Sequence, residues 1–230
     1  ALLDGLTNFT NMVPFERMSV AGSVVFQHKT GSPVHIGVVN SLVINSGSSF
    51  TIRMNDQATV RSLTGAVVYA HELTIDAGGV LEIVGAASLY VNVLNVSGTL
   101  KATGGLSRVG GKGGPGGSHD GLGGSYGGIG GIYGSAGQHQ VLYGSIMYPT
   151  DVGSIGDTRD PTRLWAGGAV RVIATGMVHI APQGIVTADG AAVGNGGTGS
   201  GGSVLIIAPK VTSYGQISAR GGRTPYGSGC

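Results

Sequence analysis

The chain has 230 residues, of which 46 are glycine and only 10% are charged. This length is enough for one domain with a full hydrophobic core. The net charge of +2 comes from scattered basic residues, which argues against binding to nucleic acid or to an anionic membrane. The longest apolar runs, such as residues 204–208, are far shorter than the roughly 20 residues that span a bilayer. We therefore expect a single domain over residues 1–230, without membrane insertion.

Residues 1–35 have no clear period, although residues 22–26 have the composition of a short strand after a glycine turn. Terminal repeats of a β-solenoid are usually atypical, because they cover the open end of the core. We expect this segment to form an N-terminal cap or a first rung.

From residue 34 the chain reads as short β segments rich in Val, Ile, Leu and Thr, and no window has a helical period. Corresponding apolar positions recur about 19 to 21 residues apart, as from Leu73 to Leu94 and from Leu81 to Leu100. This spacing is typical of one coil of a β-helix. The predicted strands are residues 38–44, 50–54, 58–63, 67–69, 73–75, 80–84 and 89–96.

A pattern of glycine, any residue, aliphatic, any residue, alanine, any residue and glycine occurs three times, at residues 98–104, 184–190 and 215–221. Each copy opens a glycine-rich segment, and the first two such segments end in strand signals at 168–174 and 202–208. Because the insertion follows the same strand each time, we expect the glycine loops on one edge of a stack. Glycine lets such loops pack without side chains between them, so a compact layer is predicted.

The longest glycine-rich insertion covers residues 104–168, and residues 221–230 read as the opening of a further one. Either later sequence or a neighbouring molecule is then expected to supply the next rung, because an open β-helix end offers unpaired strand edges. Head-to-tail stacking of copies would build a filament. These observations predict an all-β fold, a right-handed parallel β-helix with the insertion packed along one side.

Three segments carry a resemblance to a known group of proteins: Gly-Gly-Ser-His-Asp-Gly-Leu-Gly-Gly at 116–124, Tyr-Gly-Ser-Ile-Met-Tyr-Pro at 143–149 and Gly-Gly-Ala-Val-Arg-Val at 167–172. The chain from about residue 70 to its end resembles the Gly-rich parallel β-helix repeats of large surface proteins of protists, algae and plants, and of adhesin-like bacterial proteins. It departs from them at Asp120 and at residues 153–156. The resemblance implies an extracellular structural or adhesive role, with no catalytic residues to carry over.

A parallel β-helix can also be a carbohydrate-active enzyme, whose site needs grouped carboxylates near a basic residue. Residues 151–160 contain Asp151, Asp157 and Asp160, but without the spacing of a calcium loop, so we interpret them as a solvated turn and keep calcium binding as the alternative. Ser118, His119 and Asp120 are triad residue types, yet sequence neighbours seldom converge as a triad. We predict no enzyme activity, no cofactor and no metal site.

Five aromatic residues in and near the insertion are candidate contacts for a glycan or a protein interface. The alternative is that they fix the glycine layer onto the β-helix. They are Tyr126, Tyr133, Tyr143, Tyr148 and Trp165.

Two sequons make Asn8 and Asn95 candidate acceptors for N-linked glycans. Cys230 is the only cysteine, which excludes a disulfide within this chain. It is either a free thiol or half of an intermolecular disulfide.

The function expected from these features is that of a non-enzymatic structural subunit of an extracellular or cell-surface filament, with copies of itself as partners. The first alternative is a carbohydrate-binding adhesin module that uses the aromatic residues, with surface glycans as partners. The second is a carbohydrate-active β-helix enzyme.

Overall fold

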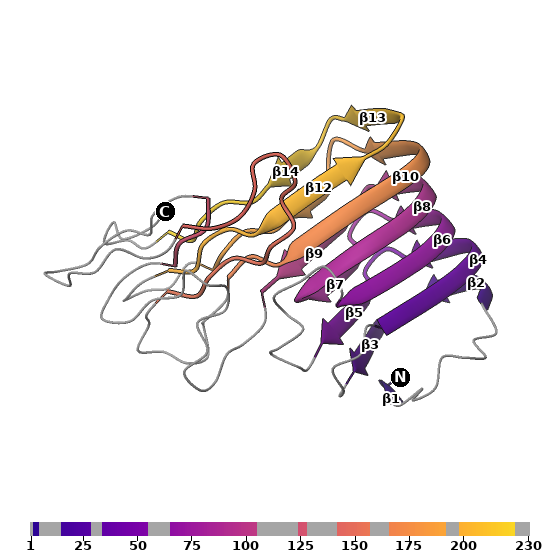
Figure 1. Cartoon of the computed structure of the whole chain (residues 1–230). Helices are drawn as coiled ribbons and strands as arrows, with labels where there is room; N and C mark the ends of the chain where they lie inside the picture. Colours follow the sequence, from indigo (N-terminus) through magenta and orange to yellow (C-terminus); the bar gives the residue numbers. More distant parts are fainter. Residues whose placement is uncertain are drawn as a thin grey trace, which may run out of the picture.

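The fold is built from β-strands alone in the part of the chain that the structure describes (Figure 1). The computed structural model describes residues 2–4, 15–28, 34–54, 65–104, 124–127, 142–156, 166–191 and 198–223. Successive strands alternate between two parallel sheets from β1 to β12, and every strand pairing within these sheets is parallel. The predictions of an all-β chain and of parallel strands are confirmed.

The first sheet has seven strands in an order that follows the chain. They are β1 (Leu2–Asp4), β3 (Ser23–His28), β5 (Ser49–Met54), β7 (Val80–Val84), β9 (Thr99–Thr103), β11 (Ile185–Thr187) and β14 (Gln216–Ser218).

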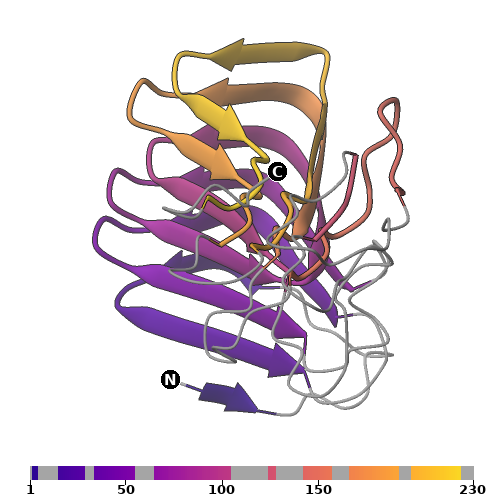
Figure 2. The ribbon, with the colours of Figure 1, turned by 90° about the vertical axis from the view of Figure 1, so that its left-hand side faces the viewer.

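The second sheet contains the longer strands, and its last position is shared by two short strands that lie end to end along β10. Its strands are β2 (Phe15–Val20), β4 (Val34–Ile44), β6 (Ala66–Ile75), β8 (Ala86–Val96), β10 (Ala169–Ile180), β12 (Ser203–Ile207) and β13 (Lys210–Ser213). Figure 1 shows β4, β6, β8 and β10 lying side by side, and Figure 2 shows the strands of the first sheet stacked in front of them.

The core consists of rows of apolar side chains that run across the strands at a fixed register. One row in the second sheet contains Leu42, Leu73, Leu94 and Val178, all of them buried. The pairing of Leu73 with Leu94, and of Leu81 with Leu100 in the first sheet, confirms the predicted repeat. Burial of each such side chain contributes about 1.5–3 kcal/mol to folding, because its surface is removed from water.

The three copies of the seven-residue pattern fall on adjacent strands of the first sheet. Thr99 of β9 pairs with Ile185 of β11, which pairs with Gln216 of β14. The aliphatic positions of the three copies therefore form one core row. The three glycine loops leave from the carboxyl ends of these adjacent strands, at one edge of the stack. This edge placement is confirmed for the described residues.

Two glycines are required by the turns that join the second sheet to the first. Ser48 N donates to Asn45 O (3.0 Å) and Gly79 N donates to Asp76 O (2.8 Å), so each turn closes over four residues. Gly47 and Gly78 occupy the third position of these turns with φ of 70° and 78°, where L side chains are strained.

The strand boundaries differ from the predicted ones in the middle of the chain. Residues 67–69 and 73–75, predicted as two strands, lie in the single strand β6. The register of β4 against β6 shifts between Val38 and Ser41, where β4 has one residue more than β6, so a β-bulge lies in β4 at this level. The pairing of β6 with β8 runs through without a register shift. In the segment predicted as a cap or first rung, β3 pairs with β5 and β2 with β4. The predicted strand at 58–63 lies outside the described residues.

Candidate functional site

The glycine-rich segments lie together beyond one end of the strands (Figure 1) and are held by backbone hydrogen bonds. The central segment is residues 198–202. Its backbone groups form hydrogen bonds with five other segments, whereas a strand inside a sheet bonds to two neighbours. The bonds are Gly124 N to Thr198 O (2.9 Å), Gly222 N to Gly199 O (2.8 Å), Gly167 N to Ser200 O (2.9 Å), Ser200 N to Ser154 O (2.9 Å) and Gly202 N to Ala188 O (2.8 Å). We call these six segments the glycine bundle; they contain Gly124, Ser154, Gly167, Ala188, residues 198–202 and Gly222.

Glycine is required in the bundle because backbone approaches backbone directly. A Cβ added to Gly202 would overlap the carbonyl oxygen of Gly168, and one added to Gly153 would lie 2.7 Å from Ser200 O. These neighbours are main-chain atoms, which cannot rotate away as a side chain can. The described parts of the loops therefore pack closely against one another, and the compact layer along one side stays a prediction.

Tyr126 joins the bundle to the second sheet, and Tyr143 is bonded within the bundle. The Tyr143 hydroxyl donates to Val152 O (2.6 Å) and lies 2.7 Å from Ser154 Oγ, while the Tyr126 hydroxyl is hydrogen-bonded to Ser203 Oγ at the start of β12. The two rings meet edge to face with centroids 5.0 Å apart. Both phenols are thus used within the molecule, and burial raises the pKa of each.

The raised pKa of Tyr143 predicts how the bundle responds to alkali. Because burial favours the neutral phenol, its pKa in the folded state lies above the ordinary 10.0. The stability that this group contributes is fully present below about pH 10 and falls as the pH rises above that value, since only the unfolded chain then ionises freely. We expect Tyr143→Phe to flatten the alkaline decline in the free energy of unfolding, measured by denaturant titration between neutral and alkaline pH. An unchanged decline would contradict the buried phenol.

Tyr148 lies on an exposed turn, unlike Tyr126 and Tyr143. Its side chain is 66% exposed and that of the nearby Ile146 is 98% exposed. Tyr148 N donates to Ser145 Oγ (3.0 Å), which closes the turn. Residues 142–150 contain no charged side chain, and this signal in the sequence marks Ile146 as well as Tyr148.

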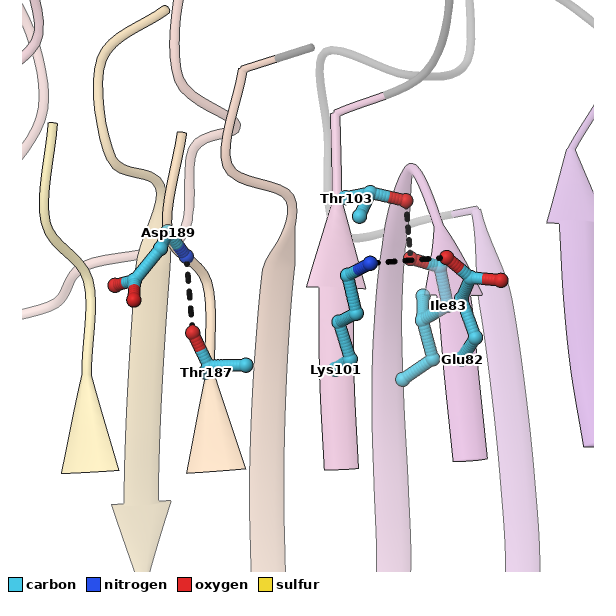
Figure 3. Close-up of polar contacts among 6 residues, drawn as sticks. All are labelled: Glu82, Ile83, Lys101, Thr103, Thr187 and Asp189. Carbon is cyan, nitrogen blue, oxygen red and sulfur yellow. Dashed lines mark hydrogen bonds and ion pairs between the residues drawn. The ribbon is translucent and has the colours of Figure 1, made fainter. Parts of the chain in front are cut away.

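Polar contacts link neighbouring strands of the first sheet where the glycine loops leave it (Figure 3). Lys101 Nζ lies 3.7 Å from Glu82 Oε1, and Thr103 Oγ1 donates to Ile83 O (3.4 Å). Asp189 accepts from Ser218 Oγ (2.9 Å) and from Arg220 N (2.6 Å) on the next rung. The exposed ion pair contributes at most about 1 kcal/mol, so these contacts serve to align the strand ends.

Asn95, the sequon residue that the structure describes, lies within β8 with its side chain half-buried. Its Nδ2 donates to Glu72 Oε1 (3.1 Å) on the adjacent strand, so in the folded chain this amide is already engaged. The other predicted site residues, Asn8, Tyr133, Trp165 and Cys230, lie outside the described residues.

Among the residues that the structure describes, the candidate catalytic side chains do not lie together. Asp151 is half-buried and its backbone oxygen accepts from Ser203 Oγ (2.6 Å), while residues 118–120 and 157–160 lie outside the described ranges. Among the described residues, no group of three His, Cys, Asp or Glu side chains is placed to hold a metal ion. The absence of an enzyme site stays a prediction.

The edge formed by β12, β13 and β14 exposes side chains that belong to core rows. Val211 continues the row of Leu94 and Val178 but is 47% exposed, and Ile217 continues the row of Leu100 and Val186 but is 44% exposed. These strands are the last in their sheets, so their outer backbone groups have no strand partner among the described residues. The repeat spacing could have identified both residues, since each occupies the inward position of its rung.

The described residues therefore define an all-β protein of two parallel sheets with an attached glycine bundle. Comparisons with protein-family models, with curated proteins and with solved structures found no match. The described part of the chain also contains no helix long and apolar enough to cross a membrane.

Proposed function

We propose that the two sheets are faces of a right-handed parallel β-helix and that the protein is a non-enzymatic structural subunit that associates with copies of itself end to end. An extracellular or cell-surface filament is the assembly that such a subunit would build. The observation that carries the proposal is the exposure of core-row side chains at the β12–β14 edge, Val211 and Ile217 above all.

The physical support is the combination of unpaired strand edges with apolar side chains in register. A second copy that adds a rung would bury both side chains and pair the edge backbone groups, as every inner rung of the two sheets does. Among the described residues, the outermost strands are β1 and β2 at one end of the stack, and β14, β12 and β13 at the other. Head-to-tail association is heterologous, and when copies stack along the direction in which the strands succeed one another, it extends as an open filament.

The double variant Val211→Asp/Ile217→Asp tests this proposal. We expect the unmodified chain to form fibres as its concentration is raised, as seen by negative-stain electron microscopy and by sedimentation. The variant is expected to stay dispersed, because each new carboxylate would be buried without a partner in the contact. The matched control is Ile146→Asp/Met147→Asp, which adds the same two charges on exposed apolar residues outside β12, β13 and β14. Dispersed unmodified protein at all concentrations would refute end-to-end association.

A carbohydrate-binding adhesin is the second candidate, and it is favoured by the exposure of Tyr148 alone among the described candidate aromatics. A tyrosine on an exposed turn can stack on a sugar, whereas Tyr126 and Tyr143 are turned into the bundle. If the protein binds glycans on an array and Tyr148→Ala removes the binding, the adhesin function would replace the structural one.

A further inference from the structure

We infer that the copy that docks on the open edge does so in one register, with its β2 on β13, and that this register sets Arg17 of one copy against Lys210 of the other. The inference rests on the proposed end-to-end association and adds its geometry and its response to salt. It follows from the row pairings of the second sheet, which can be counted across every strand from β2 to β13.

The register is defined by continuing each row by one rung. Met18 begins the core row of Leu42, Leu73 and Leu94, and Val211 ends it. Met18 is partly buried against the core at one end of the stack, and Val211 is half-exposed at the other. Placing one on the other completes the apolar row, whereas a shift by one residue would turn Met18 to the solvent face.

The lengths and irregularities of the two strands agree with this register. The four residues of β13 meet the last four residues of β2. The register irregularity of β2 between Phe15 and Arg17 lies on the same rows as the bulge of β10 between Ala174 and Met177. A docked β2 would therefore bend where β10 bends, directly beyond the start of β13.

The same register places two cations opposite each other. Arg17 pairs with Ser41, whose row continues through Glu72, Val93 and Met177 to Lys210. Both Arg17 and Lys210 are exposed, and neither forms an ion pair with another described residue. Facing cations on adjacent strands repel each other, and dissolved salt weakens the repulsion.

Glu16, the acidic neighbour of Arg17 in the chain, does not remove the repulsion between Arg17 and Lys210. Glu16 lies opposite the bulge of β4, and its Oε1 accepts from Asn40 Nδ2 (3.4 Å) on that strand, which is on the inner side of β2. Its carboxylate is thus directed away from the edge that would meet β13. The contact is expected to be weak at low ionic strength and to strengthen as salt is added.

Charge reversal at the two positions tests the register. We expect Lys210→Glu and Arg17→Glu each to lower the concentration needed for assembly roughly threefold to tenfold at low salt, since each creates an opposite-charge pair. In the double variant Arg17→Glu/Lys210→Glu, a carboxylate of one copy lies opposite a carboxylate of the next. This variant should therefore assemble as poorly as the unmodified chain. Arg53→Glu makes the same change of net charge on an exposed residue within the first sheet and serves as the control.

The measurement is the critical concentration from sedimentation at low and high salt, with melting temperatures to show that each variant is folded. Equal effects of Lys210→Glu and Arg53→Glu, or a double variant that assembles as well as the singles, would overturn the register while leaving end-to-end association in place. Absence of assembly by the unmodified chain at every salt concentration would overturn both proposals.

Discussion

Gly202→Ala is expected to destabilise the protein by roughly 3 kcal/mol or more, at the upper end of single-residue effects. The new methyl group would overlap the carbonyl oxygen of Gly168 and the backbone of Gly167, and Gly202 N also donates to Ala188 O (2.8 Å). Since all of these are main-chain atoms, relief requires the strand start of β12 and the bundle to move apart. The measurement is the denaturant midpoint by circular dichroism.

Gly127→Ala is the matched control for this substitution. No atom lies within 4 Å of the position that its Cβ would occupy, and its backbone is not in the left-handed region. We expect a change within about 0.5 kcal/mol, as for an ordinary surface substitution. Equal effects of the two alanine variants would show that the glycine bundle is not packed as described.

Leu94→Ala is expected to cost about 2–5 kcal/mol, because it removes a buried side chain from the middle of a core row and leaves a cavity. Its row neighbours Leu73 and Val178 are also buried, so the rungs on either side cannot close the gap without breaking their own pairings. Val93→Ala, on the partly exposed neighbour in β8, is the control and should cost clearly less. The free energies of unfolding from urea titration decide between them, and a similar loss for both variants would contradict the assignment of the inward face.

Apolar spacing alone was sufficient to predict the repeat and its register. Leu73 and Leu94 are equivalent in the sequence pattern and are paired in the structure, and the same holds for Leu81 and Leu100. Such a pattern can be read because each rung must place its large side chains inward at the same position, whatever follows in the loops.

The bends were not predicted. Residues 67–69 and 73–75 resemble two strands because their alternation is interrupted, yet they form one strand whose pairing with β8 has no register shift.

For the tyrosines, the sequence left two uses open, contact with a partner and attachment of the glycine layer. Tyr126, Tyr143 and Tyr148 resemble one another in the sequence, but Tyr126 is bonded to β12, Tyr143 is bonded within the bundle and Tyr148 is exposed. The position of Tyr126 depends on Ser203, which is 77 residues away in the chain and meets it only after folding.

The sequence by itself determined the all-β class, the rungs and the side of the sheets from which the glycine loops leave, because these follow from local periodicity. Only the tertiary structure decided which glycines are indispensable, since that depends on which backbone segments meet at van der Waals distance. It likewise decided that Val211 and Ile217, which occupy core-row positions, are exposed among the described residues. Exposure is a property of neighbours in space, and the chain order of residues does not contain it.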